Sequence, residues 1–104
     1  MNVLVVPDAA LRDSDSIEML RVWIAEERLW CSIKTGIYKR RGGVSEERAW
    51  GVILADATRH IADALAADFG MTPSETIQLI RENFIAELDK PTSKTEGQFV
   101  SNSN

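Results

Sequence analysis

Residues 20–35 alternate between apolar and polar side chains on both sides of Glu26 and Glu27. Alternation with a period of two is typical of β-strands that bury one face. A turn between Glu26 and Glu27 would pair two strands, and a shift of one residue would send every apolar side chain to the opposite face. The segment therefore predicts a hairpin with a fixed register, whose apolar face holds the pairs Ile24–Leu29, Val22–Cys31 and Leu20–Ile33.

The other face of this hairpin, which should meet solvent, carries two tryptophans. Trp23 lies directly opposite Trp30 in the predicted register. Exposed apolar patches usually mark an interface, so these rings could lie in a homodimer contact or beneath the N-terminal segment. Stacked aromatic rings beside basic side chains are also how single-stranded nucleic acids are bound. The basic residues on this face are Arg21, Arg28 and Lys34.

The charge of the chain is unevenly distributed. The net charge is −4, which argues against nonspecific nucleic-acid binding over the whole surface. Residues 28–45 nevertheless contain basic side chains and no acidic one, and Arg40 and Arg41 are among them. A basic patch on an acidic body could serve self-association or the binding of a polyanion.

Two helices are predicted in the second half of the chain. Ser45 is a good N-cap for a helix over residues 46–69, and Gly70 is suited to end it. Thr72 to Glu75 forms a capping-box pattern with Pro73 at the first helical position, and the second helix should stop before Pro91. The short connection predicts an antiparallel helical hairpin.

The predicted fold class is α+β, with a small antiparallel sheet packed under the helical hairpin. The order is ββαα, or βββαα if Val3–Val6 adds an edge strand. A chain of 104 residues is one domain by size, which we assign to residues 1–90. Residues 91–104 are polar, and we expect a disordered tail there.

The expected setting is the cytoplasm. A single cysteine, Cys31, excludes an intrachain disulfide and fits a reducing compartment. The N-terminus lacks the pattern of a signal peptide, and no apolar stretch approaches the ~20 residues that cross a bilayer. We therefore expect a soluble protein without a membrane partner.

A polar stripe on the first helix is the best candidate for chemistry. It contains Asp56, Arg59, His60 and Asp63 on the side opposite the apolar face. A small enzyme could use His60 with Asp56 for acid–base work, whereas the simpler explanation is an exposed ladder of ion pairs. One histidine and one cysteine are too few for a metal site, so neither a metal nor a cofactor is expected.

Small residues form a second stripe on the same helix, which would let another helix approach closely. The partner could be the second helix or the same helix of another protomer. The stripe consists of Gly51, Ala55, Thr58, Ala62 and Ala66.

Several segments resemble a known protein family. They are Leu20–Trp23, Pro7–Asp13, Ala49–Gly51, Leu54–Asp56 and Arg59–Ala62. Together they are similar to an alphaproteobacterial family named domain of unknown function 5076, over most of residues 4–91. The resemblance implies a soluble bacterial protein and no particular activity.

These observations lead to three functional hypotheses. The first is a non-enzymatic interaction module that forms a homodimer through the Trp23/Trp30 face or the small-residue stripe. The second is a binder of single-stranded nucleic acid or another polyanion, and the third is a small enzyme centred on His60. Residues named for binding are Trp23, Trp30, Arg21, Arg28, Lys34, Arg40 and Arg41, and no catalytic residue is assigned.

Overall fold

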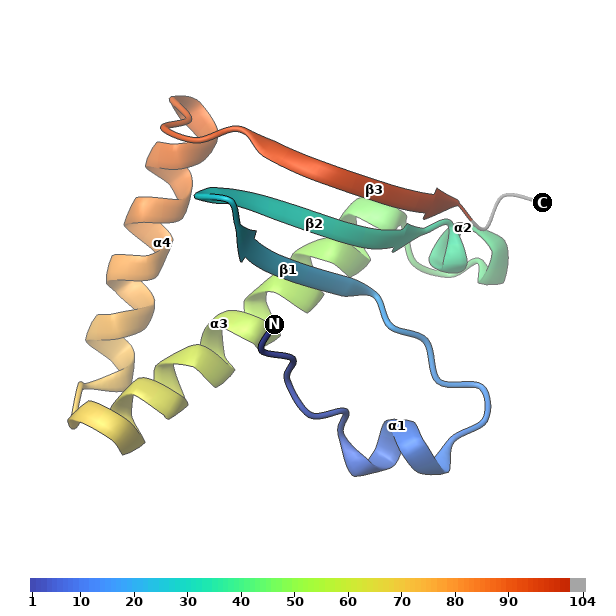
Figure 1. Ribbon diagram of the computed structural model, residues 1–104, viewed down its shortest axis with the longest axis horizontal. Helices are drawn as coiled ribbons and strands as arrows, with labels where there is room; N and C mark the ends of the chain where they lie inside the picture. The colour runs from blue at the N-terminus through green and yellow to red at the C-terminus, as the bar shows by residue number, and fades with distance from the viewer. Residues whose placement is uncertain (102–104) are drawn as a thin grey trace.

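The computed structural model describes residues 1–101 and contains a three-stranded sheet and four helices in that range (Figure 1). The strand order is β1-β2-β3, with β1 and β2 antiparallel and β2 and β3 parallel. The α+β class and the helical hairpin are confirmed, but the sheet is mixed rather than antiparallel. The elements in chain order are α1 (Asp8–Arg12), β1 (Leu20–Ala25), β2 (Arg28–Thr35), α2 (Ile37–Arg41), α3 (Glu46–Phe69), α4 (Pro73–Asp89) and β3 (Thr95–Ser101).

The β1–β2 hairpin has the predicted register. Trp23 is paired with Trp30, and the three apolar pairs fall as expected. Glu26 and Glu27 form the turn with φ angles of 52° and 63°. Positive φ at both central residues is the geometry that matches the twist of a two-residue hairpin, although Asn and Gly adopt it more readily than Glu.

The third strand comes from the end of the chain and not from its beginning. Thr95–Ser101 forms β3 where we expected a disordered tail, so that expectation was wrong for these residues. Val3–Val6, the proposed edge strand, is outside any strand. Gly97 permits the pairing, because a Cβ atom there would overlap the backbone carbonyl of Cys31 and because its φ is 138°. The last part of the expected tail, residues 102–104, lies outside the described residues.

The two long helices begin and end where the sequence predicted. The Ser45 hydroxyl accepts a hydrogen bond from the N–H of Arg48 at 3.3 Å, and Gly70 ends α3 in the left-handed conformation. Pro73 is the first residue of α4, and α4 ends at Asp89. Among the described residues, neither these helices nor the shorter ones could span a membrane.

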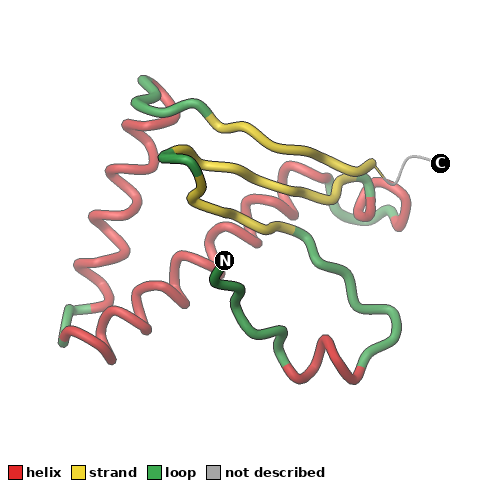
Figure 2. Tube along the Cα trace, viewed as in Figure 1, coloured by secondary structure: helices red, strands yellow, loops and turns green. Residues whose placement is uncertain are grey.

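The sheet and the helical hairpin are held together loosely. The helices diverge from the turn at Gly70 (Figure 2), and contacts between them and the strands are few. Figure 1 shows the resulting open arrangement. The buried residues of the described chain are Ile37, Ala49, Ala62 and Thr76, which make a very small core. The predicted packing of the sheet under the helices is therefore only partly achieved within one chain.

Two global measures describe the same openness. The radius of gyration is 15.6 Å, whereas a compact chain of this length has about 13 Å. The accessible surface is 8814 Å², whereas a folded monomer of 11.6 kDa exposes about 5,800 Å². The chain thus leaves roughly 3,000 Å² uncovered that a compact monomer would bury.

Candidate functional site

The tryptophan pair lies on one face of the hairpin as predicted, and both rings are half-buried. The Trp30 indole donates its Nε1–H to the backbone carbonyl of Ala25 at 2.8 Å. The Arg21 guanidinium lies over the Trp23 ring, 6.0 Å from its centroid. The polar edge of Trp30 is therefore used inside the chain, and Trp23 is partly covered by a cation.

The arginines on this face are engaged by carboxylates. Arg21 makes two hydrogen bonds to Glu18, at 2.5 and 2.8 Å, and these lower the pKa of Glu18 below its ordinary value. Arg28 pairs with Glu96 of β3 at 2.9 Å. Both pairs reduce the positive charge that the tryptophan face offers to a phosphate. The sequence analysis missed both carboxylates.

Part of the basic segment 28–45 is a short helix, α2, whose N-terminus already holds an anion. Lys39, Arg40 and Arg41 form the last turn of α2. The Glu46 carboxylate accepts hydrogen bonds from the backbone N–H groups of Gly36 at 2.9 Å, Tyr38 at 2.8 Å and Lys39 at 3.1 Å.

These contacts make Glu46 an internal ligand for the end of α2. The hydrogen bond from Gly36 is the largest cause that lowers the pKa of Glu46, and those from Lys39 and Tyr38 add to it. An external phosphate at this N-terminus would have to displace the carboxylate. Arg40 and Arg41 remain exposed at the opposite end of α2.

The polar stripe on α3 is exposed and is dominated by one ion pair. Arg59 bonds to Asp56, one turn away on the helix. His60 and Asp63 are both exposed. Within residues 1–101, no group of three His, Cys, Asp or Glu side chains could hold a metal ion.

The small-residue stripe has two different halves. Ala62 is fully buried and Thr76 of α4 is 3 % exposed, which indicates that the two helices approach each other there. Gly51 and Ala55, closer to the start of α3, are exposed, and a Cβ atom at Gly51 would meet open space. The stripe thus serves the helical hairpin at one end and stays free at the other.

Large apolar side chains are uncovered on the face opposite the tryptophans. Val22 is 50 % exposed and Ile24 is 83 % exposed, although both belong to the apolar face of the hairpin. Phe99 of β3 is paired with Ile33 and is 76 % exposed. Phe84, Ile85 and Leu88, in the last turns of α4, are exposed as well. The sequence located Val22 and Ile24 on this face, but predicted that the helices would cover the sheet.

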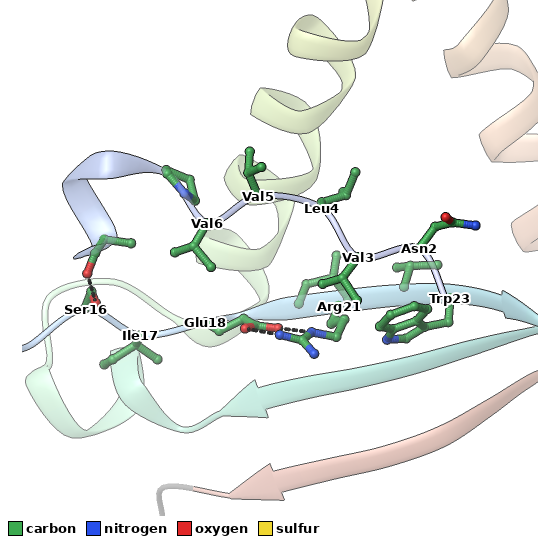
Figure 3. Close-up of a pocket in the computed structure, with 14 residues that line it drawn as sticks. Asn2, Val3, Leu4, Val5, Val6, Ser16, Ile17, Glu18, Arg21 and Trp23 are labelled. Atoms are coloured by element: carbon green, nitrogen blue, oxygen red, sulfur yellow. Dashed lines mark hydrogen bonds and ion pairs between the residues drawn. The ribbon is translucent and has the colours of Figure 1, made fainter.

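A groove runs between β1 and the N-terminal segment 2–7 (Figure 3). Its volume is about 570 Å³, and its walls come from residues 2–7 and 16–23. The labelled side chains of Val3, Arg21 and Trp23 lie on opposite sides of this opening. The sequence did not indicate the groove, because Val3–Val6 was considered only as an optional edge strand of the sheet.

Comparison with known proteins identifies the family. Residues 3–92 match the family described as Domain of unknown function (DUF5076). The chain belongs to this family. The matched segment ends just before β3. No curated protein matches the chain.

A similar solved structure is described as that of "a putative pyruvate dehydrogenase from the photosynthetic bacterium Rhodopseudomonas palustrus CGA009". The two chains share 27 % identity and superimpose with a TM-score of 0.64. The similarity covers 90 % of each chain.

Proposed function

We propose that this DUF5076 chain is a cytoplasmic interaction module that works as a homodimer. The observation that carries the proposal is the roughly 3,000 Å² of surface beyond that of a compact monomer. Obligate homodimers bury about 2,000–5,000 Å² in total, or half of that on each subunit. The excess on one chain is large enough for such an interface.

The chemistry of the uncovered surface supports the same proposal. Val22, Ile24 and Phe99 on the sheet, with Phe84 and Leu88 on α4, are large apolar side chains open to water. Monomers rarely expose apolar groups in such number, whereas the interfaces of obligate dimers resemble a domain core cut in half. A second copy would complete the core that one chain lacks.

The tryptophan face is a weaker candidate for this interface than we inferred from the sequence. Trp23 and Trp30 are half-buried and tied to Arg21 and to the Ala25 carbonyl. The free half of the small-residue stripe, Gly51 and Ala55, remains a suitable place for a partner helix. We therefore assign the interface to the apolar sheet face, the end of α4 and this half of the stripe.

Light scattering after size-exclusion chromatography tests the proposal. A dimer mass is expected at low micromolar concentration, together with a melting temperature that rises with protein concentration. A monomer at high micromolar concentration with a concentration-independent melting temperature would contradict it.

Polyanion binding is the second candidate, supported by the exposed Arg40 and Arg41 at the end of α2 and by the tryptophan pair, although both rings are half-buried. The ion pairs of Arg21 and Arg28 count against it. It predicts quenching of tryptophan fluorescence by single-stranded oligonucleotides, weakening steeply with salt. Unchanged fluorescence at low salt would remove this candidate.

An enzyme centred on His60 and Asp56 is the third candidate. It is supported by the description of the similar Rhodopseudomonas structure as that of "a putative pyruvate dehydrogenase". The pairing of Asp56 with Arg59 leaves the aspartate oriented toward an arginine. Assay of pyruvate oxidation with the purified chain tests it, with the variant His60→Ala as control. Absence of turnover in both proteins would refute it.

A further inference from the structure

β1 is an edge strand with a free row of backbone groups. The N–H of Lys34 donates to the carbonyl of Met19 at 3.0 Å, which makes these two residues a hydrogen-bonded pair. Such pairs alternate along an antiparallel ladder, so Arg21 and Trp23 also bond to β2. It follows that Leu20, Val22 and Ile24 direct their N–H and C=O groups away from β2.

Nothing in residues 1–101 bonds to this outer row. The hydrogen bonds outside the regular ladders and helices do not involve the backbone of Leu20, Val22 or Ile24. Natural proteins usually protect an edge of this kind with proline, lysine or a bulge. β1 has the sequence LRVWIA and pairs with β2 without interruption, so it has no proline, lysine or bulge, and its one charged residue, Arg21, is paired with Glu18. An unprotected apolar edge is a template for another strand.

The groove beside β1 has room for most of the paired part of that strand. The N-terminal segment runs past β1 without pairing to it, and about 570 Å³ separates the two (Figure 3). One residue of extended chain occupies roughly 160 Å³, given the spacings between residues, strands and sheets. The groove therefore accommodates three to four residues, which is most of the five-residue stretch from Leu20 to Ile24 that carries the free row.

We propose that β1 pairs antiparallel with β1 of a second copy, about a two-fold axis at Val22, so that two sheets join into one. This inference rests on the proposed homodimer and adds the edge of β1 to its interface. In this register Val22 faces Val22 of the partner subunit, and Leu20 faces Ile24 of the partner subunit. All three outward-facing residues of each strand then have a backbone partner.

The side chains of β1 are complementary to themselves in this register. On the apolar face, the exposed Ile24 contacts an aliphatic neighbour and loses its contact with water. On the other face, Arg21 lies opposite Trp23 of the partner subunit, which extends the cation–aromatic contact already present within one chain.

Neighbouring registers are less favourable. An axis at Arg21 would place the two Arg21 side chains directly opposite each other, and like charges in that position are destabilising. An axis at Trp23 would place Leu20 opposite Glu26 of the partner subunit, in the turn, and would leave its backbone groups without a strand partner. The axis at Val22 avoids both.

Disulfide trapping in full-length protein tests the register. In a Cys31→Ser background, Val22→Cys should form a covalent dimer, because facing residues of a hydrogen-bonded pair have Cα atoms about 5.5 Å apart. Ile24→Cys is the matched control. It is the more exposed residue, yet the two copies of it would lie about 14 Å apart, four residues along the strand and one strand spacing across.

We expect Val22→Cys to cross-link at least tenfold faster than Ile24→Cys. A mixture of Leu20→Cys and Ile24→Cys proteins should form a mixed disulfide. Equal cross-linking rates for the two single variants would contradict the register but not the homodimer. The same holds if no cross-link forms in a protein that is dimeric by light scattering. A monomer by light scattering would overturn both.

One further measurement tells whether the edge of β1 is covered by a second copy or by the chain's own segment 3–6. Hydrogen exchange at the Val22 amide should slow as protein concentration rises, because a second copy supplies its partner. Slow exchange that does not depend on concentration would assign the edge to the chain's own segment 3–6 and overturn the proposal.

Discussion

The substitution Ile24→Ala should weaken the homodimer strongly while leaving the fold of one chain nearly intact. It removes three carbon groups, each contributing about 0.8 kcal/mol when fully buried. Since Ile24 is 83 % exposed in the single chain, burial of its side chain in the dimer contributes about 2 kcal/mol of stabilisation that the single chain lacks. A symmetric interface contains the residue twice, so the loss is about 4 kcal/mol, or roughly a thousandfold in the dissociation constant.

Sedimentation equilibrium over a wide concentration range measures this change. Leu11→Ala is the matched control, because Leu11 is 72 % exposed on α1 and lies outside the proposed interface. Circular dichroism of both variants at high concentration checks that each is folded. A dissociation constant for Ile24→Ala within threefold of the unmodified protein, or equal weakening by Leu11→Ala, would refute the assignment of this face to the interface.

Three further predictions concern the fold. Glu46→Gln should lower the melting temperature at pH 7. Because the pKa of Glu46 is depressed in the folded state, the stabilisation by its carboxylate is present above the ordinary pKa of 4.5 and is lost as pH falls through the folded pKa. The difference in melting temperature between the two proteins should therefore shrink in acid, and a constant difference would contradict the role of Glu46 as a ligand of α2. Gly97→Ala should release β3, seen as fast hydrogen exchange over residues 95–101, whereas Gly51→Ala, which has open space around it, should leave that exchange unchanged. Replacing Glu26-Glu27 by Asn-Gly should relieve the left-handed strain of the hairpin turn and stabilise the chain by about 1–2 kcal/mol in thermal unfolding, and a lower melting temperature would count against that geometry.

The elements that the sequence predicted well are those encoded locally. The register of the hairpin follows from strict alternation around Glu26 and Glu27, and the ends of the long helices follow from Ser45, Gly70 and Pro73. Each of these signals lies within a few residues of the structure that it determines.

The features that the sequence did not predict depend on distant partners. β3 is polar and contains a glycine, and it becomes a strand because β2 offers a free edge to it. The carboxylates that engage Arg28 and the N-terminus of α2 come from Glu96 and Glu46, and no local pattern indicates either contact.

The prediction about the candidate site that differs most from the structure is that the helices cover the apolar face of the sheet. Periodicity showed that Val22 and Ile24 share a face that should be buried, and we expected the two long helices of the same chain to cover it. Periodicity reports that a face needs cover, but it does not report which chain supplies the cover. The three-dimensional arrangement leaves these side chains exposed, so the face that lacks cover is the one opposite the tryptophans.

The parallel pairing of β3 has a consequence for the order in which the chain folds. Arg28 and Glu96, which the pairing brings together, are 68 positions apart, whereas the hairpin and the helical hairpin close over short loops. Closing a long loop is slow because its entropy is lost before its contacts form. β3 should therefore dock last, after the rest of the nascent chain has taken shape. In that interval β2 has an open side, so that at high concentration it could accept the same segment from another molecule, and rapid refolding of dilute protein should favour the correct pairing.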